Sequence, residues 1–69
     1  MRVELANPQR VILDEIANGM TRDSVALTYA FCIKQREQVD FPTINRAIIE
    51  RWSMSALEHI KRRAWAKFK

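Results

Sequence analysis

The sequence predicts an all-α fold, a compact bundle of four short helices whose last two form a helix-turn-helix-like pair. Three observations lead to this prediction. Apolar residues recur at helical spacing in four segments, each segment follows residues that favour a helix start, and no second strand exists to pair with the one stretch that would suit a strand. The 69 residues are expected to form one domain, 1–69, near the lower size limit for folding without disulfides or metals.

The first helix is expected to begin at Asn7-Pro8 and to stop at Gly19. Asparagine caps free N–H groups, and proline fits the first turn because no donor is needed there. Glycine takes the left-handed conformation that ends a helix at low cost. The apolar face of this helix is predicted to contain Ile12, Leu13, Ile16 and Ala17.

The second helix is expected to follow a Thr21 cap and to be the central core helix. Residues 25–33 are apolar almost all round, which in a helix indicates neighbours on more than one side. The single cysteine, Cys32, has apolar helical neighbours and no partner for a disulfide, so it is expected to be a buried thiol. Residues 34–40 lose the apolar pattern and should form a connection.

Two further helices are expected on either side of a break at Ser53. Because proline cannot sit in a helix interior, Pro42 marks the start of the third helix near Thr43. The fourth helix should run from about Met54 to Lys67. The apolar side of the third helix is predicted to be Ile44, Ala47, Ile48 and Trp52. The apolar stripe of the fourth is predicted to be Leu57, Ile60, Ala64 and Phe68, flanked by Met54 and Trp65, with both tryptophans packed in the core.

The net charge of +4 is concentrated in the last two helices. Residues 1–40 carry five cations and six anions, whereas residues 41–69 carry seven cations and two anions. No acid follows Glu58, but five cations do: Lys61, Arg62, Arg63, Lys67 and Lys69. Such a one-sided basic end indicates an anionic partner, most often nucleic acid and less often an anionic membrane surface.

The pair of helices over residues 43–62 carries an ordered set of small and apolar residues. An alanine is followed by an apolar residue and a serine that can cap the second helix, and two apolar positions lie four and seven residues after the serine: Ala47, Trp52, Ser53, Leu57 and Ile60. This pattern resembles the helix-turn-helix of small phage and bacterial regulators. Arg51 stands where that family usually has glycine, and a left-handed arginine would be strained, so a longer or differently shaped turn is also compatible. Arg46 and Glu50 replace apolar residues of the family.

The physical case for duplex DNA is independent of that resemblance. The first turn of a recognition helix reaches base edges, while cations along it hold phosphates. The residues expected to lie at the bases are Ser55, Ala56 and His59, next to the cap Ser53. The residues expected to contact phosphates are Arg62, Arg63, Lys67 and Lys69, with Thr43 and Arg46 as anchors near the start of the third helix. Lys61 lies inside the apolar arc, so its stem must run past Leu57 and Trp65.

Enzymatic function is not expected. His59 is the only histidine, and the sequence has no glycine-rich phosphate loop, metal cluster or nucleophile–base pair, so no cofactor or metal is expected either. The sequence begins without a secretory signal pattern and has no window of about 20 apolar residues, so a soluble cytoplasmic protein is expected.

Several alternatives to DNA binding remain open. The basic block would also suit a solvated helix end whose cations complement the helix dipole. The chain would also suit an adaptor or inhibitor that binds a protein partner through an exposed aromatic face, and the end of the fourth helix is similar to a membrane-surface or calmodulin-target segment. RNA is less favoured. For DNA, a homodimer is expected because specific affinity normally needs two half-sites. Exposure of Trp65 and Phe68 would favour a protein or membrane partner.

Overall fold

Four α-helices and one short 3₁₀ helix make up residues 7–67, the part of the chain that the computed structural model describes. The α-helices are α1 (Pro8–Ala17), α2 (Arg22–Lys34), α3 (Phe41–Arg51) and α4 (Met54–Ala66). The 3₁₀ helix η1 (Arg36–Gln38) lies in the connection between α2 and α3. No strand is assigned within residues 7–67, so the all-α prediction is confirmed.

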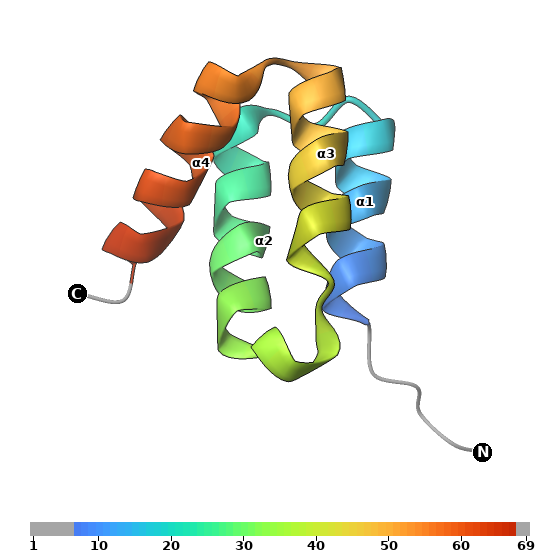
Figure 1. Cartoon of the computed structure of the whole chain (residues 1–69), viewed down its shortest axis with the longest axis vertical. Coiled ribbons are helices and arrows are strands. Elements are labelled where there is room, and N and C mark those ends of the chain that lie inside the picture. The colour runs from blue at the N-terminus through green and yellow to red at the C-terminus, as the bar shows by residue number, and fades with distance from the viewer. Residues whose placement is uncertain (1–6, 68–69) are drawn as a thin grey trace.

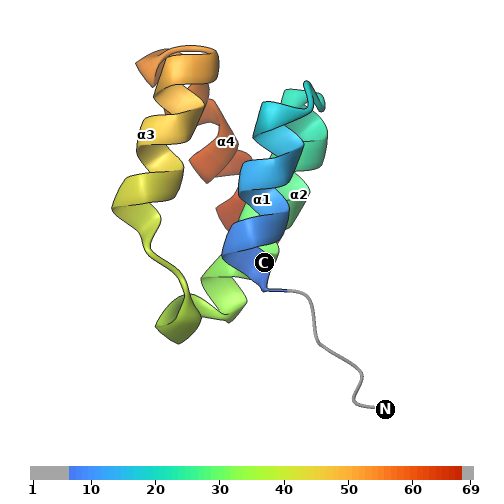
Figure 2. The ribbon, with the colours of Figure 1, turned by 90° about the vertical axis from the view of Figure 1, so that its right-hand side faces the viewer.

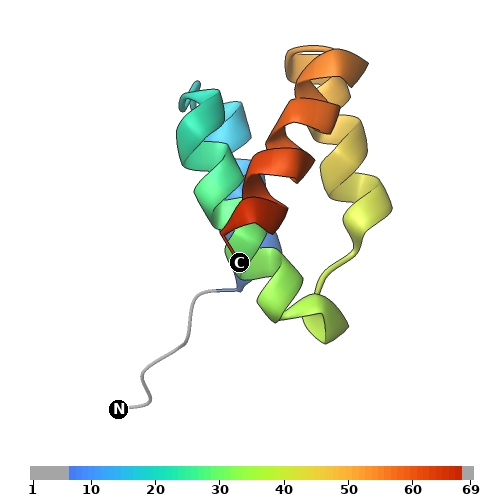
Figure 3. The ribbon, with the colours of Figure 1, turned by 90° about the vertical axis from the view of Figure 1, so that its left-hand side faces the viewer.

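Each of the four α-helices packs against two of the others. Both α1 and α4 pack against α2 and against α3, so that α1 and α4 lie on opposite sides of the α2–α3 pair (Figures 1 and 2). Seen from the other side, α4 covers the space between α2 and α3 (Figure 3). The basic helix α4 therefore lies at the surface of the bundle, with one side against the core and the other toward solvent.

Side-chain caps begin three of the four helices, as the sequence predicts. Asn7 Oδ1 accepts a hydrogen bond from the backbone N–H of Gln9 at 2.9 Å, and Thr21 Oγ1 accepts one from Ser24 at 3.2 Å. Ser53 has the same role at α4. Each cap satisfies a donor that the helix itself leaves unpaired, which is worth about 1 kcal/mol.

Gly19 ends α1 in the left-handed conformation, with φ at +78°. Its N–H donates to the carbonyl of Ile16 at 3.4 Å, and the N–H of Met20 donates to the carbonyl of Glu15 at 3.0 Å. This pair of bonds is the Schellman arrangement, which satisfies carbonyls at the helix end.

Replacing Gly19 with alanine should destabilise the fold by about 1 kcal/mol, because an L side chain pays for the left-handed conformation. A Cβ at this position would lie 3.7 Å from Arg51 Nη2, an ordinary contact, so the cost is conformational rather than steric. Urea unfolding would measure it. The exposed Asn18→Ala provides the neighbouring control, and equal midpoints for the two variants would contradict the prediction.

The core is formed by aliphatic residues from all four helices. The largest fully buried side chains are Ile12, Val25, Cys32, Ile44, Ile48 and Ile60. Cys32 is a buried thiol, as predicted, and its Sγ lies 3.5 Å from the carbonyl oxygen of Pro8, to which it donates. Ile44 and Ile48 form the predicted core face of α3, with Ala47 and Trp52 partly buried beside them.

Several sequence-based expectations about burial were wrong. Ala17 is exposed at the end of α1, where the last turn has passed the core. The second helix has neighbours on more than one side, α1 and α4, as predicted, but its apolar run is not buried throughout, since Leu27 is 55% and Phe31 46% exposed. Met54 and Trp65 are also more than half exposed. The third helix begins at Phe41, ahead of the predicted start, because its first turn needs no N–H donors and so accepts the following proline.

Candidate nucleic-acid interface

The turn before the basic helix consists of two residues. Arg51 is the last helical residue of α3, Trp52 follows, and Ser53 is extended, with φ at −175°. Ser53 Oγ accepts a hydrogen bond from the backbone N–H of Ala56 at 3.1 Å. Within residues 7–67 only Gly19 has positive φ, so the left-handed strain considered for Arg51 does not occur. The Arg51 guanidinium instead lies 5.3 Å from the centre of the Trp52 ring, an attractive cation–π distance.

The core side of α4 matches the predicted stripe as far as the structure describes it. Leu57, Ile60 and Ala64 are buried, while Phe68 lies outside the described residues. Ala56 is also buried, at 2% exposed, because it precedes Ile60 by one helical turn and so lies on the same side. The expectation that Ala56 lies at the DNA bases is therefore wrong. Its methyl group packs inside the protein.

The solvent side of α4 carries a polar stripe. Ser55, His59 and Arg62 are all exposed and are spaced four and three residues apart, so they follow one another along one face of the helix. This stripe starts in the first turn, two residues after the Ser53 cap. Glu58 is also exposed and lies four residues before Arg62, where its negative charge lowers the local positive potential.

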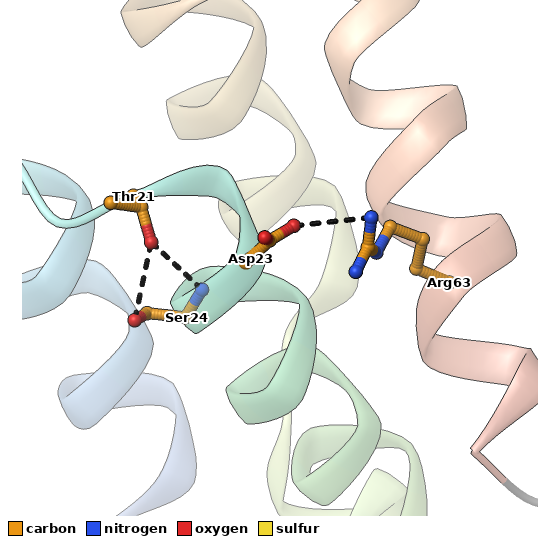
Figure 4. A network of polar contacts seen from close by, with 4 residues as sticks. All are labelled: Thr21, Asp23, Ser24 and Arg63. Atoms are coloured by element: carbon orange, nitrogen blue, oxygen red, sulfur yellow. Dashed lines mark hydrogen bonds and ion pairs between the residues drawn. The ribbon is translucent and has the colours of Figure 1, made fainter.

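Arg63 joins α4 to the start of α2. Its Nη1 lies 3.2 Å from Asp23 Oδ1, and Thr21 and Ser24 form a hydrogen-bonded cap beside the aspartate (Figure 4). Both charged side chains remain largely exposed, at 50% and 71%, so the pair contributes at most about 1 kcal/mol. Arg63 is accessible to a phosphate, but it would have to share its charge with Asp23.

The remaining predicted contact residues are more dispersed. Thr43 Oγ1 donates to Asp40 Oδ2 at 2.8 Å, so a carboxylate already lies at the start of α3, where a phosphate anchor was predicted. Arg46 is exposed one turn further along α3, and Lys67 is exposed just after α4. Lys69 lies outside the described residues.

A groove between α2, α3 and α4 was not predicted from the sequence. It has a volume of about 430 Å³ and is lined by Tyr29, Ile33, Arg36, Phe41, Asn45, Lys61 and Trp65. Lys61 is partly buried here, next to the half-exposed Trp65. The one sequence signal for the groove was the position of Lys61 inside the apolar arc of the helix. A lysine at that position lays its stem along apolar surface and keeps its charged end in water, so this part of the arc stays open to solvent.

Tyr29 is one of the residues that line this groove. Its hydroxyl donates to Asn45 Oδ1 at 2.7 Å, and its ring centre lies 5.6 Å from that of Phe41. Burial raises the pKa of the Tyr29 hydroxyl to about 12, and the nearby Cys32 adds to this, while the bond to Asn45 acts in the opposite direction. Burial likewise raises the pKa of the Cys32 thiol to about 11, with a smaller contribution from Glu15. Both groups are therefore neutral at physiological pH and neither is poised for catalysis.

Comparison with known proteins gave no match among family models, curated sequences or solved structures. Within residues 7–67 no helix is both long and apolar enough to cross a membrane. The same residues contain no group of three or more histidine, cysteine or acidic side chains placed to hold a metal ion. The chain is therefore characterised by its fold and its surfaces: an all-α bundle of four helices with a basic, half-exposed last helix.

Proposed function

We propose that this chain is a small DNA-binding protein, a transcriptional regulator or accessory factor related to the helix-turn-helix regulators, that lays the solvent side of α4 on duplex DNA. The observation that supports the proposal best is the Ser55–His59–Arg62 stripe. It begins at the first turn of a helix whose other side is fixed in the core by Leu57 and Ile60. A rigid helix with donors in its first turns is the element that reads base edges in a major groove.

The distribution of exposed charge supports the same proposal. On α3 and α4 the exposed cations are Arg46, Arg51, Arg62 and Arg63, and Lys67 follows them. Cations on the edges of a groove-bound helix are placed to contact phosphates, which supply most of the affinity and make it depend on salt. The proposal includes a cytoplasmic location and binding as a homodimer, because one short helix reaches few base pairs.

Titration of duplex DNA at several salt concentrations tests the proposal. Affinity should fall as salt rises, with a slope of about 0.9 in log–log terms for each phosphate contact. Arg62→Ala should weaken binding to all sequences and reduce that slope by about one contact. The matched control is Arg10→Ala, an exposed arginine on α1. The helices α1 and α4 lie on opposite sides of the bundle (Figure 2). Affinity that does not respond to salt, or equal losses in the two variants, would overturn the proposal.

Substitutions at the start of the stripe should change sequence preference instead. Ser55→Ala and His59→Ala remove groups that can hydrogen-bond base edges, so they should reduce the difference between the preferred and a random duplex. Non-specific affinity at low salt should stay close to that of the unchanged protein. A preferred sequence selected from a random pool provides the reference duplex. If both variants still prefer this duplex to a random one as strongly as the unchanged protein does, these residues do not contact bases.

A protein-interaction module is the second candidate, and the groove beside Trp65 favours it. Trp65 is 52% exposed, and Arg36 and Lys61 lie in the same groove, so an acidic partner with an apolar side chain would fit it. Trp65→Ala separates the two functions. It should leave DNA affinity almost unchanged if α4 binds through its Ser55–His59–Arg62 stripe, whereas it should abolish binding of a partner that occupies the groove.

A further inference from the structure

The side of α2 that faces solvent carries two adjacent large apolar residues. Leu27 is 55% and Phe31 46% exposed, and they are one helical turn apart. The same helix buries six residues on its other sides, among them Val25 and Tyr29, so the core does not lack apolar material. Adjacent exposed apolar side chains on a folded surface commonly mark a contact with another molecule.

A hollow lies directly beside these residues. It has a volume of about 250 Å³ and is lined by Leu27, Ala30, Phe31, Lys34 and Lys67. The surface therefore offers both projecting apolar side chains and a recess next to them. Helix pairs associate through this combination, in which side chains of one helix enter recesses of the other.

The charges at the two ends of this surface are opposite in sign, and they indicate that the partner is a second copy of the chain. Asp23 lies four residues before Leu27, and Lys34 lies three residues after Phe31, so all four residues follow one side of α2. If a second copy packs its α2 in the antiparallel direction, Asp23 of each chain lies opposite Lys34 of the other. The same register places Leu27 opposite Phe31. The pattern is self-complementary, as an interface with two-fold symmetry requires.

We propose that two copies of this chain associate through antiparallel α2 helices, with Leu27 and Phe31 at the centre and Asp23–Lys34 pairs at both ends. The ion pair of Asp23 with Arg63 does not prevent this, since the Asp23 side chain is still 71% exposed and can accept from a second cation. An acidic partner helix would satisfy Lys34 but would be repelled by Asp23. This interface does not depend on DNA binding and would stand if the DNA titration failed.

Self-association also suits the size of the chain. A domain of 69 residues is close to the limit for stable folding, and association adds burial that the single chain lacks. Covering Leu27 and Phe31 removes from water the two exposed large apolar residues of α2.

Analytical ultracentrifugation over a wide concentration range tests the interface. The unchanged protein should sediment as a dimer at high concentration, and Phe31→Glu should weaken dimerisation by at least tenfold, because each symmetric interface contains the substitution twice. Met54→Glu is the matched control, since Met54 is 57% exposed and lies on α4. Circular dichroism should show that both variants keep their helices, because both side chains are exposed in the single chain.

Charge exchange tests the antiparallel register. Lys34→Glu places two acids together at each end and should weaken the dimer, and Asp23→Lys should do the same with two cations. The double variant should recover part of the lost affinity. Arg63→Ala measures separately the loss of the Asp23 contact inside the chain.

The proposal would be overturned by a monomer at all concentrations, by a dimer that Phe31→Glu leaves intact, or by single charge variants that the double variant does not rescue. Binding of a monomer to anionic lipid vesicles, lost in Phe31→Glu, would assign the surface to a membrane instead and would also overturn it.

Discussion

Replacing Ile60 with alanine is expected to remove most of the stability of the fold. Ile60 is fully buried at the centre of α4 and is part of the core cluster that joins this helix to the rest of the bundle. Removing its outer carbons costs about 2–5 kcal/mol, which includes the cavity that remains. A single core of this size supplies about 3–5 kcal/mol in total. The loss is therefore comparable with the whole stability of the chain.

Circular dichroism during urea unfolding would measure the effect of Ile60→Ala. Two controls bracket it. Ile60→Val keeps most of the side chain and should cost about 0.5–1.5 kcal/mol. Arg62→Ala changes an exposed residue of the same helix and should leave the midpoint almost unchanged. A midpoint for Ile60→Ala within the range of these controls would show that α4 is not fixed to the core as described.

The helices and most of their ends were predictable because the signals are local, although α3 begins at Phe41 and not near Thr43 as expected. A cap such as Thr21 satisfies a donor three residues away, and Gly19 provides the conformation that its own position requires. Burial depends on how the helices pack against one another, and that packing joins residues that are far apart in the sequence. The apolar residues of α2 nearly surround the helix, so the sequence alone does not indicate that Leu27 and Phe31 lie on the side without a neighbour.

The candidate interface was predictable only in part, for the same reason. Helical spacing places Ser55, His59 and Arg62 on one side of α4, and the structure has them exposed. Ala56 is small enough to suit either a DNA groove or a protein core. Whether it is exposed or buried depends on how α4 packs, and in the structure it is buried. The contact between Arg63 and Asp23 joins residues that are far apart in the chain, so no local pattern announces it.

Alkaline pH should destabilise the protein through two buried groups of α2, Tyr29 and Cys32. Burial raises the pKa of the Tyr29 hydroxyl from 10.0 to about 12 and that of the Cys32 thiol from 9.0 to about 11. In the unfolded chain both groups return to their ordinary values and lose protons more readily. Each therefore stabilises the fold fully below its unfolded pKa, and this contribution is lost as pH rises through the folded pKa.

The free energy of unfolding should consequently be insensitive to these two groups up to about pH 9 and should decline from there toward pH 12. The loss is on the order of 2 kcal/mol for each group, enough for the two together to unfold a chain of this size. Urea unfolding at a series of pH values would measure it.

Tyr29→Phe should cost about 1 kcal/mol at neutral pH, because the bond to Asn45 is lost, yet should flatten the decline above pH 10. Cys32→Ala should flatten the part that begins at lower pH. If the double variant declined as steeply as the unchanged protein, relative to its own value at neutral pH, then groups other than these two would govern the alkaline transition.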